Sequence, residues 1–141
     1  MAKHVVVENL SVVFGNPKAQ QAALKLIDEG KTPAEIRKET GATVANRNVN
    51  FDIQPDELFV IVGLSGSGKS TFIRTLNLLN TPTRGDIKIN GESLLDLTKE
   101  ELREYRRKDV SMVFQHFGLL SHRTVLENVE YPLEIQGIDK E

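Results

Sequence analysis

Cysteine is missing from the 141-residue chain, and no long uninterrupted apolar run occurs in it. Without thiols the protein has no disulfide framework and no thiolate zinc site, a composition that fits the cytosol. A membrane-spanning helix needs roughly 20 predominantly apolar residues in a row, which this sequence does not offer, so we expect a soluble chain. The formal net charge of −2 argues against a general electrostatic grip on nucleic acid, so nucleic acid is not an expected partner.

The remaining composition is that of an ordinary globular protein. Hydrophobic residues make up 39% and charged residues 27% of the chain, whose length allows one domain with a real core. The N-terminal sequence MAKHVVVENL has no apolar segment of roughly 7–15 residues after a basic start, so it does not resemble a secretory signal.

The first part of the chain predicts a strand followed by a helix. Residues 4–14 are β-branched and partly alternate in polarity, which is typical of a strand. A helix is expected to begin at Pro17 and to end at Gly30. The apolar residues that would share one face of this helix are Ala19, Ala22, Ala23, Leu26 and Ile27.

A second short helix and a second strand are expected next. The helix should follow Thr32, because Thr32 and Glu35 match the capping-box pattern, and it should end at Gly41. Residues 43–53 read as a strand, and the polar segment 54–57 reads as a turn.

The second half of the chain alternates between the same two element types. The unbroken apolar run 58–62 predicts a strand buried on both faces, at the centre of a sheet. A helix ending before Pro82 should follow, and residues 86–90 predict another strand that ends in an Asn-Gly turn. A charged helix is expected over about 98–107, and residues 111–115 return to a strand pattern.

The sequence IVGLSGSGKST, residues 61–71, carries the clearest chemistry. The pattern G-x-x-x-x-G-K-[ST] is met by Gly63, Gly68, Lys69 and Ser70, after an apolar run and before an amphipathic helix pattern. A loop of this kind cradles phosphate groups, so we expect a P-loop over residues 63–71.

The residue types in this loop suit the binding of phosphate and Mg²⁺ for physical reasons. Backbone N–H groups of residues 65–70 can turn inward around phosphate oxygens, and side chains at Gly66 and Gly68 would block that approach. Lys69 is expected to bridge the β- and γ-phosphates while Ser70 ligates Mg²⁺. A P-loop alone does not separate an ATPase from a GTPase or a kinase, but the N-K-x-D element that usually reads guanine is absent.

Several separated segments together resemble the nucleotide-binding subunit of an ABC transporter, of the glycine betaine/proline osmoprotectant importer type. The resemblance covers nearly the whole chain. It rests on VENLSVVFG, on a helical insert at about 16–41, on the loop sequence with the RTLNLLNTPTRGDIKING that follows it, and on residues 112–137. The implied fold is α/β and P-loop NTPase-like: a strand, P-loop and helix core, antiparallel β-strands and the short helical insert. Residues 1–141 would be the N-terminal part of that nucleotide-binding domain.

The resemblance implies a nucleotide site for ATP and Mg²⁺. Phe14 would stack on adenine, although an ordinary core role is the alternative from sequence alone. Gln115, in a Q-loop region at 112–123, would meet Mg²⁺ and the attacking water. The implied catalytic residues are thus Lys69 and Gln115, and the implied metal ligands are Ser70 and Gln115. The implied nucleotide-binding residues are Phe14, Gly63, Ser65, Gly66, Ser67, Gly68, Lys69, Ser70 and Thr71.

The resemblance also implies partners and a location. The complete subunit would form a homodimer, bind a transmembrane permease subunit and lie at the cytoplasmic face of the plasma membrane. The apolar segment HFGLLSHRTVLENV would either pack in a core or form the groove that receives the permease subunit.

Three elements of the family are absent from the sequence: the Leu-Ser-Gly-Gly-Gln signature, the Walker B acidic pair and the switch histidine, a role that neither His116 nor His122 fills. We therefore expect the 141 residues to bind ATP without hydrolysing it, while a complete parent would be a transport ATPase. The alternatives are a subunit of another ABC importer class, such as one for amino acids, or a P-loop kinase or NTPase of another family.

Overall fold

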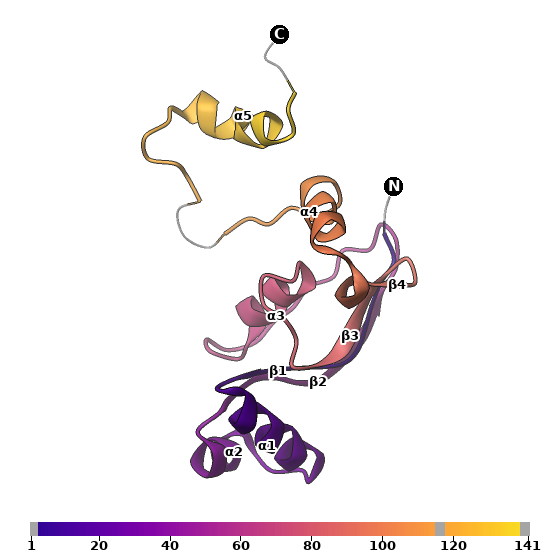
Figure 1. Ribbon diagram of the computed structural model, residues 1–141, viewed down its shortest axis with the longest axis vertical. Helices are drawn as coiled ribbons and strands as arrows, with labels where there is room; N and C mark the ends of the chain where they lie inside the picture. The colour runs from indigo at the N-terminus through magenta and orange to yellow at the C-terminus, as the bar shows by residue number, and fades with distance from the viewer. Residues whose placement is uncertain (1–2, 115–117, 139–141) are drawn as a thin grey trace. The chain divides into compact units, whose positions relative to one another are not determined.

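The computed structural model describes residues 3–114 and 118–138, and Figure 1 shows the arrangement of its helices and strands. The chain divides into two compact units, Met1–Thr98 and Lys99–Glu141. All the strands of the described residues and the phosphate-loop sequence belong to the first unit.

The first unit is built on a four-stranded antiparallel sheet with the order β2-β1-β3-β4. Its strands are β1 (Val5–Phe14), β2 (Thr43–Ile53), β3 (Arg84–Ile89) and β4 (Glu92–Ser93). The strands expected at 4–14, 43–53 and 86–90 are confirmed, and the turn at Asn90-Gly91 joins β3 to β4. A short 3-10 helix, η1 (Leu94–Asp96), follows β4.

Two helices, α1 (Pro17–Asp28) and α2 (Pro33–Thr40), form the insert between β1 and β2. The helices lie together at one end of these two strands (Figure 1). Their packing buries an apolar cluster of Val13, Ala23, Leu24, Ile27, Ile36 and Ala42. Leu24, which the sequence did not place on the buried face, belongs to this cluster, whereas Ala22 does not.

The capping box at the start of α2 forms as expected. The Thr32 backbone N–H and hydroxyl both donate to Glu35 Oε2 at 2.7 Å, and the Glu35 N–H donates to Thr32 Oγ1 at 3.3 Å. These bonds to the ionised carboxylate, the one from the Thr32 backbone first, hold the pKa of Glu35 below its usual range.

Two arginines attach the insert to the sheet. Arg84 at the start of β3 donates to both carboxylate oxygens of Asp28 at 2.8 Å, and also to Asn48 Oδ1 at 2.7 Å. Arg47 on β2 donates to the carbonyls of Ile27 and Lys31 at the C-terminal end of α1. The end of α1 is therefore held by side chains from two strands.

The apolar run 58–62 is not a strand, which corrects the expectation of a buried sheet centre there. A strand needs a neighbour for its N–H and C=O groups, and no described residue pairs with this run. Leu58 is 88% and Val62 86% exposed. The run is held instead through Phe59, whose ring stacks on Phe51 with centroids 4.9 Å apart.

Helix α3 (Lys69–Leu76) follows the loop and ends well before Pro82, as expected. It buries Phe72, whose ring meets the ring of Phe51 edge-on with centroids 5.1 Å apart. The aromatic cluster of Phe51, Phe59 and Phe72 therefore connects β2, the extended run and α3.

The second unit contains two helices, α4 (Lys99–Lys108) and α5 (Val125–Ile135). Residues 111–114 are not a strand, because no described segment pairs with them, and Gln115 lies outside the described residues. Asn128 on α5 binds the loop before it: its side chain accepts from Leu120 N at 2.7 Å and donates to Leu120 O at 3.1 Å.

The apolar segment in this second unit lies at its surface. Leu119, Val125 and Val129 are exposed and line a cavity of 240 Å³, so the described part of this segment does not form a core. No helix within the described residues is long and apolar enough to cross a membrane.

Candidate nucleotide-binding site

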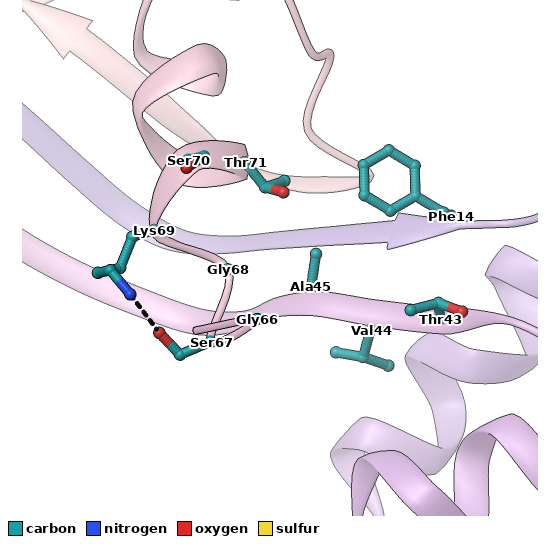
Figure 2. Close-up of a pocket in the computed structure, with 10 residues that line it drawn as sticks. All are labelled: Phe14, Thr43, Val44, Ala45, Gly66, Ser67, Gly68, Lys69, Ser70 and Thr71. Atoms are coloured by element: carbon teal, nitrogen blue, oxygen red, sulfur yellow. Dashed lines mark hydrogen bonds between the residues drawn. The ribbon is translucent and has the colours of Figure 1, made fainter. Parts of the chain in front are cut away.

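A pocket of 310 Å³ in the first unit contains most of the predicted site. Figure 2 shows Phe14, at the end of β1, on one side of it and Lys69, at the start of α3, on the other. The lining residues are Phe14, Thr43, Val44, Ala45, Gly66, Ser67, Gly68, Lys69, Ser70 and Thr71. Residues from three elements and one loop thus share one cavity.

The glycines let the loop lie against β2. Gly66 and Gly68 have φ angles of 78° and 90°, in the left-handed region that residues with a side chain rarely adopt. A Cβ on Gly68 would fall on the carbonyl oxygen of Ala45. Gly68 is therefore required both by its backbone conformation and by the close approach of the strand.

Lys69 points back over the loop that precedes it. Its ammonium donates to Gly63 O at 2.7 Å, to Leu64 O at 2.6 Å and to Ser67 Oγ at 3.3 Å, the last bond being drawn in Figure 2. The ammonium charge is thereby fixed beside the loop, next to the N-terminus of α3, whose unpaired N–H groups add partial positive charge. Both features favour an anion in the pocket.

The ring of Phe14 is available to a ligand. It is 47% exposed and lines the pocket, so the core role that the sequence left open does not apply. Side chains bond the backbone of the preceding residue: Gln20 Nε2 and Thr83 Oγ1 donate to Val13 O at 3.0 and 3.3 Å, and Val13 N donates to Thr83 Oγ1 at 2.9 Å. The ring is therefore presented from a rigid strand end.

The structure adds a wall that sequence reasoning missed. Thr43, Val44 and Ala45 at the start of β2 line the pocket between Phe14 and the loop. Their residue types give no sequence signal for this role, which follows from the strand register that pairs Phe14 with Thr43.

Two described residues of the predicted site do not line this pocket. Ser65 does not line either pocket at the loop, and Gly63 lines a second cavity of 490 Å³ together with the aromatic cluster. Gln115 lies outside the described residues. Within the first unit, the glycine-rich loop, Lys69 and the exposed ring of Phe14 thus line one cavity.

A model of the family described as ABC transporter matches residues 46–141. The glycine betaine transport ATP-binding protein OpuAA of Bacillus subtilis (strain 168) is 50% identical over 137 residues, 97% of this chain and 32% of that protein. The glycine betaine/proline betaine transport system ATP-binding protein ProV of Escherichia coli (strain K12) is 43% identical over 141 residues, 100% of this chain and 35% of that protein. The chain therefore spans about a third of the length of these curated relatives.

A solved structure shows the same architecture. The dimeric structure of a post-hydrolysis state of the ATP-binding cassette MJ0796, bound to ADP and Pi, matches with a TM-score of 0.71 at 31% identity, covering 97% of this chain and 50% of that one. The fold is thus that of an ABC ATPase cassette, mixed α/β with an antiparallel sheet. The chain belongs to the ABC transporter family, as part of an ATP-binding domain, which confirms the resemblance seen in the sequence.

Proposed function

We propose that the chain is the ATP-binding portion of an ABC importer that powers uptake of glycine betaine- or proline-type osmoprotectants. The transported solute is inferred from the names of OpuAA and ProV, which match 97% and 100% of this chain. ATP binding is inferred from the pocket itself, and one observation carries it: the phosphate loop and the exposed ring of Phe14 line the same cavity.

The proposed binding mode assigns a role to each part of the pocket. The base stacks on Phe14, and the triphosphate lies over the loop, where backbone N–H groups and the α3 N-terminus face it. The residues proposed to bind nucleotide are Phe14, Gly63, Ser65, Gly66, Ser67, Gly68, Lys69, Ser70 and Thr71. Of these, Gly63 and Ser65 are proposed from the loop sequence and do not line the pocket.

Lys69 supplies the full positive charge. In the nucleotide-free chain its ammonium is bonded to the neutral carbonyls of Gly63 and Leu64. A phosphate oxygen carries negative charge and a carbonyl oxygen does not, so a triphosphate in the pocket would compete well for this ammonium. A short movement of one flexible side chain would then complete the cradle.

The residues at the loop also suit Mg²⁺. Ser70 lines the pocket, and magnesium takes only a few protein oxygens when phosphate oxygens and waters supply the rest. The described residues contain no group of three or more His, Asp or Glu side chains that would hold a metal ion without a nucleotide. We propose Ser70 and Gln115 as its protein ligands, and the bound ion would neutralise charge on the β- and γ-phosphates.

The proposed complete subunit works with partners. A second copy of the ATPase subunit and a transmembrane permease subunit are the proposed partners, at the cytoplasmic face of the plasma membrane. The exposed surface around Leu119, Val125 and Val129 is the proposed permease contact. The 141 residues by themselves are proposed to bind Mg-ATP without turnover, because the sequence encodes neither the signature segment nor the acidic pair.

Titration calorimetry of the chain with Mg-ATP tests the assignment of the loop. Lys69→Ala is expected to abolish triphosphate binding, because backbone amides alone do not neutralise the phosphate charge. Lys88→Ala is the matched control, since Lys88 is bonded to Glu8 at 2.6 Å on the sheet and does not line the pocket. If Lys69→Ala binds Mg-ATP with undiminished affinity, the assignment of phosphate binding to this loop is wrong.

A further inference from the structure

Asn46, which follows the pocket wall on β2, has no role in the binding mode above. Ala45 lines the proposed nucleotide pocket, whereas Asn46 lines the second cavity, of 490 Å³. Ser67 and Lys69 line both cavities. The phosphate loop therefore borders Ala45 in the first cavity and Asn46 in the second.

The side chain of Asn46 contacts the point where the loop becomes a helix. Its Nδ2 donates to the carbonyl oxygen of Gly68 at 3.3 Å. The same carbonyl accepts the N–H of Phe72 at 2.9 Å, the first backbone bond of α3. Asn46 therefore joins β2 to the residue whose conformation sets the end of the phosphate loop.

The other polar atom of this side chain is buried without a partner. Asn46 Oδ1 has no hydrogen-bond partner among the described residues. An unpaired buried oxygen is unfavourable for folding, and a leucine of similar size would avoid that cost. The amide cannot simply be rotated, because the oxygen would then face the Gly68 carbonyl oxygen.

We propose that Asn46 is a positioning residue for the phosphate loop. By donating to Gly68 O it holds the loop against β2 before nucleotide arrives, so that the loop amides need less rearrangement when phosphate binds. This role rests on the proposed function of the loop. The unpaired Oδ1 lowers the stability of the fold, and this loss accompanies the donor that Nδ2 provides to Gly68 O.

Amide hydrogen exchange of the nucleotide-free chain tests the proposal independently of ATP. The informative amides are Phe72 N, bonded to Gly68 O, and Ser67 N, bonded to Leu64 O at 3.2 Å. Loss of one neutral hydrogen bond in Asn46→Leu is expected to speed their exchange by about three- to tenfold. The melting temperature should stay equal or rise, and Mg-ATP affinity should fall by a similar factor.

Two further variants make the result interpretable. Asn46→Ala removes the same donor without adding bulk, and it should speed exchange of the same two amides if Asn46→Leu does not fold. Asn50→Ala is the matched control, because Asn50 lies on the same strand but its amide bonds to Asn9 N and Asn48 O. This control should leave exchange in the loop unchanged.

The outcomes separate this inference from the proposed function. Faster exchange confined to Ser67 and Phe72 together with weaker Mg-ATP binding supports positioning by Asn46, and an unchanged Mg-ATP affinity in the same variants would overturn it. Unchanged exchange at Ser67 and Phe72, or faster exchange spread over the whole sheet with a lower melting temperature, would overturn it. A wild-type chain that does not bind Mg-ATP contradicts the proposed function instead.

Discussion

Truncation of Phe14 separates a ligand-binding role from a packing role. Base stacking on an aromatic ring contributes about 1–3 kcal/mol, so Phe14→Ala should weaken Mg-ATP binding by about 5- to 140-fold. Complete burial of a phenylalanine side chain contributes about 1.5–3 kcal/mol, and this residue is 47% exposed, so the free energy of unfolding should fall by only about 1 kcal/mol. Equilibrium dialysis with labelled Mg-ATP and urea unfolding measure the two quantities on the same samples.

Substitutions that keep an aromatic face provide the control. Phe14→Tyr and Phe14→Trp should retain nearly full affinity, since every aromatic ring offers a π-face. Leu95→Ala truncates an apolar side chain of similar exposure, 41%, in the same unit and outside the pocket, so its affinity should not change. A Phe14→Ala chain that binds Mg-ATP normally would refute stacking, whatever its stability.

Four further outcomes are expected. Gly68→Ala should reduce Mg-ATP affinity at least tenfold in binding titrations, because its Cβ would meet the Ala45 carbonyl and force the loop away from β2; normal affinity would show that the loop adapts. The carboxyl of Glu35 should titrate below its usual pKa by NMR, so the stability contributed by the capping box is present at neutral pH and lost as the pH falls through that lowered pKa. Thr32→Ala should raise this pKa and cost about 0.5–2 kcal/mol of stability, whereas an unshifted pKa in that variant would exclude the hydroxyl as a cause. In a phosphate-release assay the 141-residue chain should show no turnover; release that disappears in Lys69→Ala would mean that it supplies a catalytic acid from another residue.

Local signals in the sequence predicted much of the first unit. Helix α2 follows from the capping box and from the glycine after it, and β1, β2 and β3 follow from their β-branched patterns. The phosphate loop and the start of α3 follow from one glycine-rich motif. The helix signals lie within a few residues of each other, and the β-branched patterns predict that strands form, but not the pairing of Val5 with Ile53 and Ile89 far along the chain.

The runs 58–62 and 111–114 show the limit of such reasoning. Their apolar composition favours buried strands, but a strand also needs a partner, and no described segment pairs with either run. Helix α5 was missed although Thr124 and Glu127 form a capping box before an apolar segment. The wall at Thr43–Ala45 was missed because it depends on strand register rather than on residue type.

The helical insert leaves and rejoins the sheet at a single pair of residues, Phe14 and Thr43, which face each other across β1 and β2. Just beyond this pair the two ends still nearly touch, since a Cβ on Gly15 would lie 3.5 Å from the Cα of Ala42. For protein engineering, a segment that replaces the insert would need closely spaced ends, and it would have to replace the packing around Val13 and Ala42 and the bonds that Arg47 and Arg84 make to the insert. Phe14, at this junction, is the residue proposed to stack on the base, so a reporter domain inserted after it would lie beside the bound nucleotide.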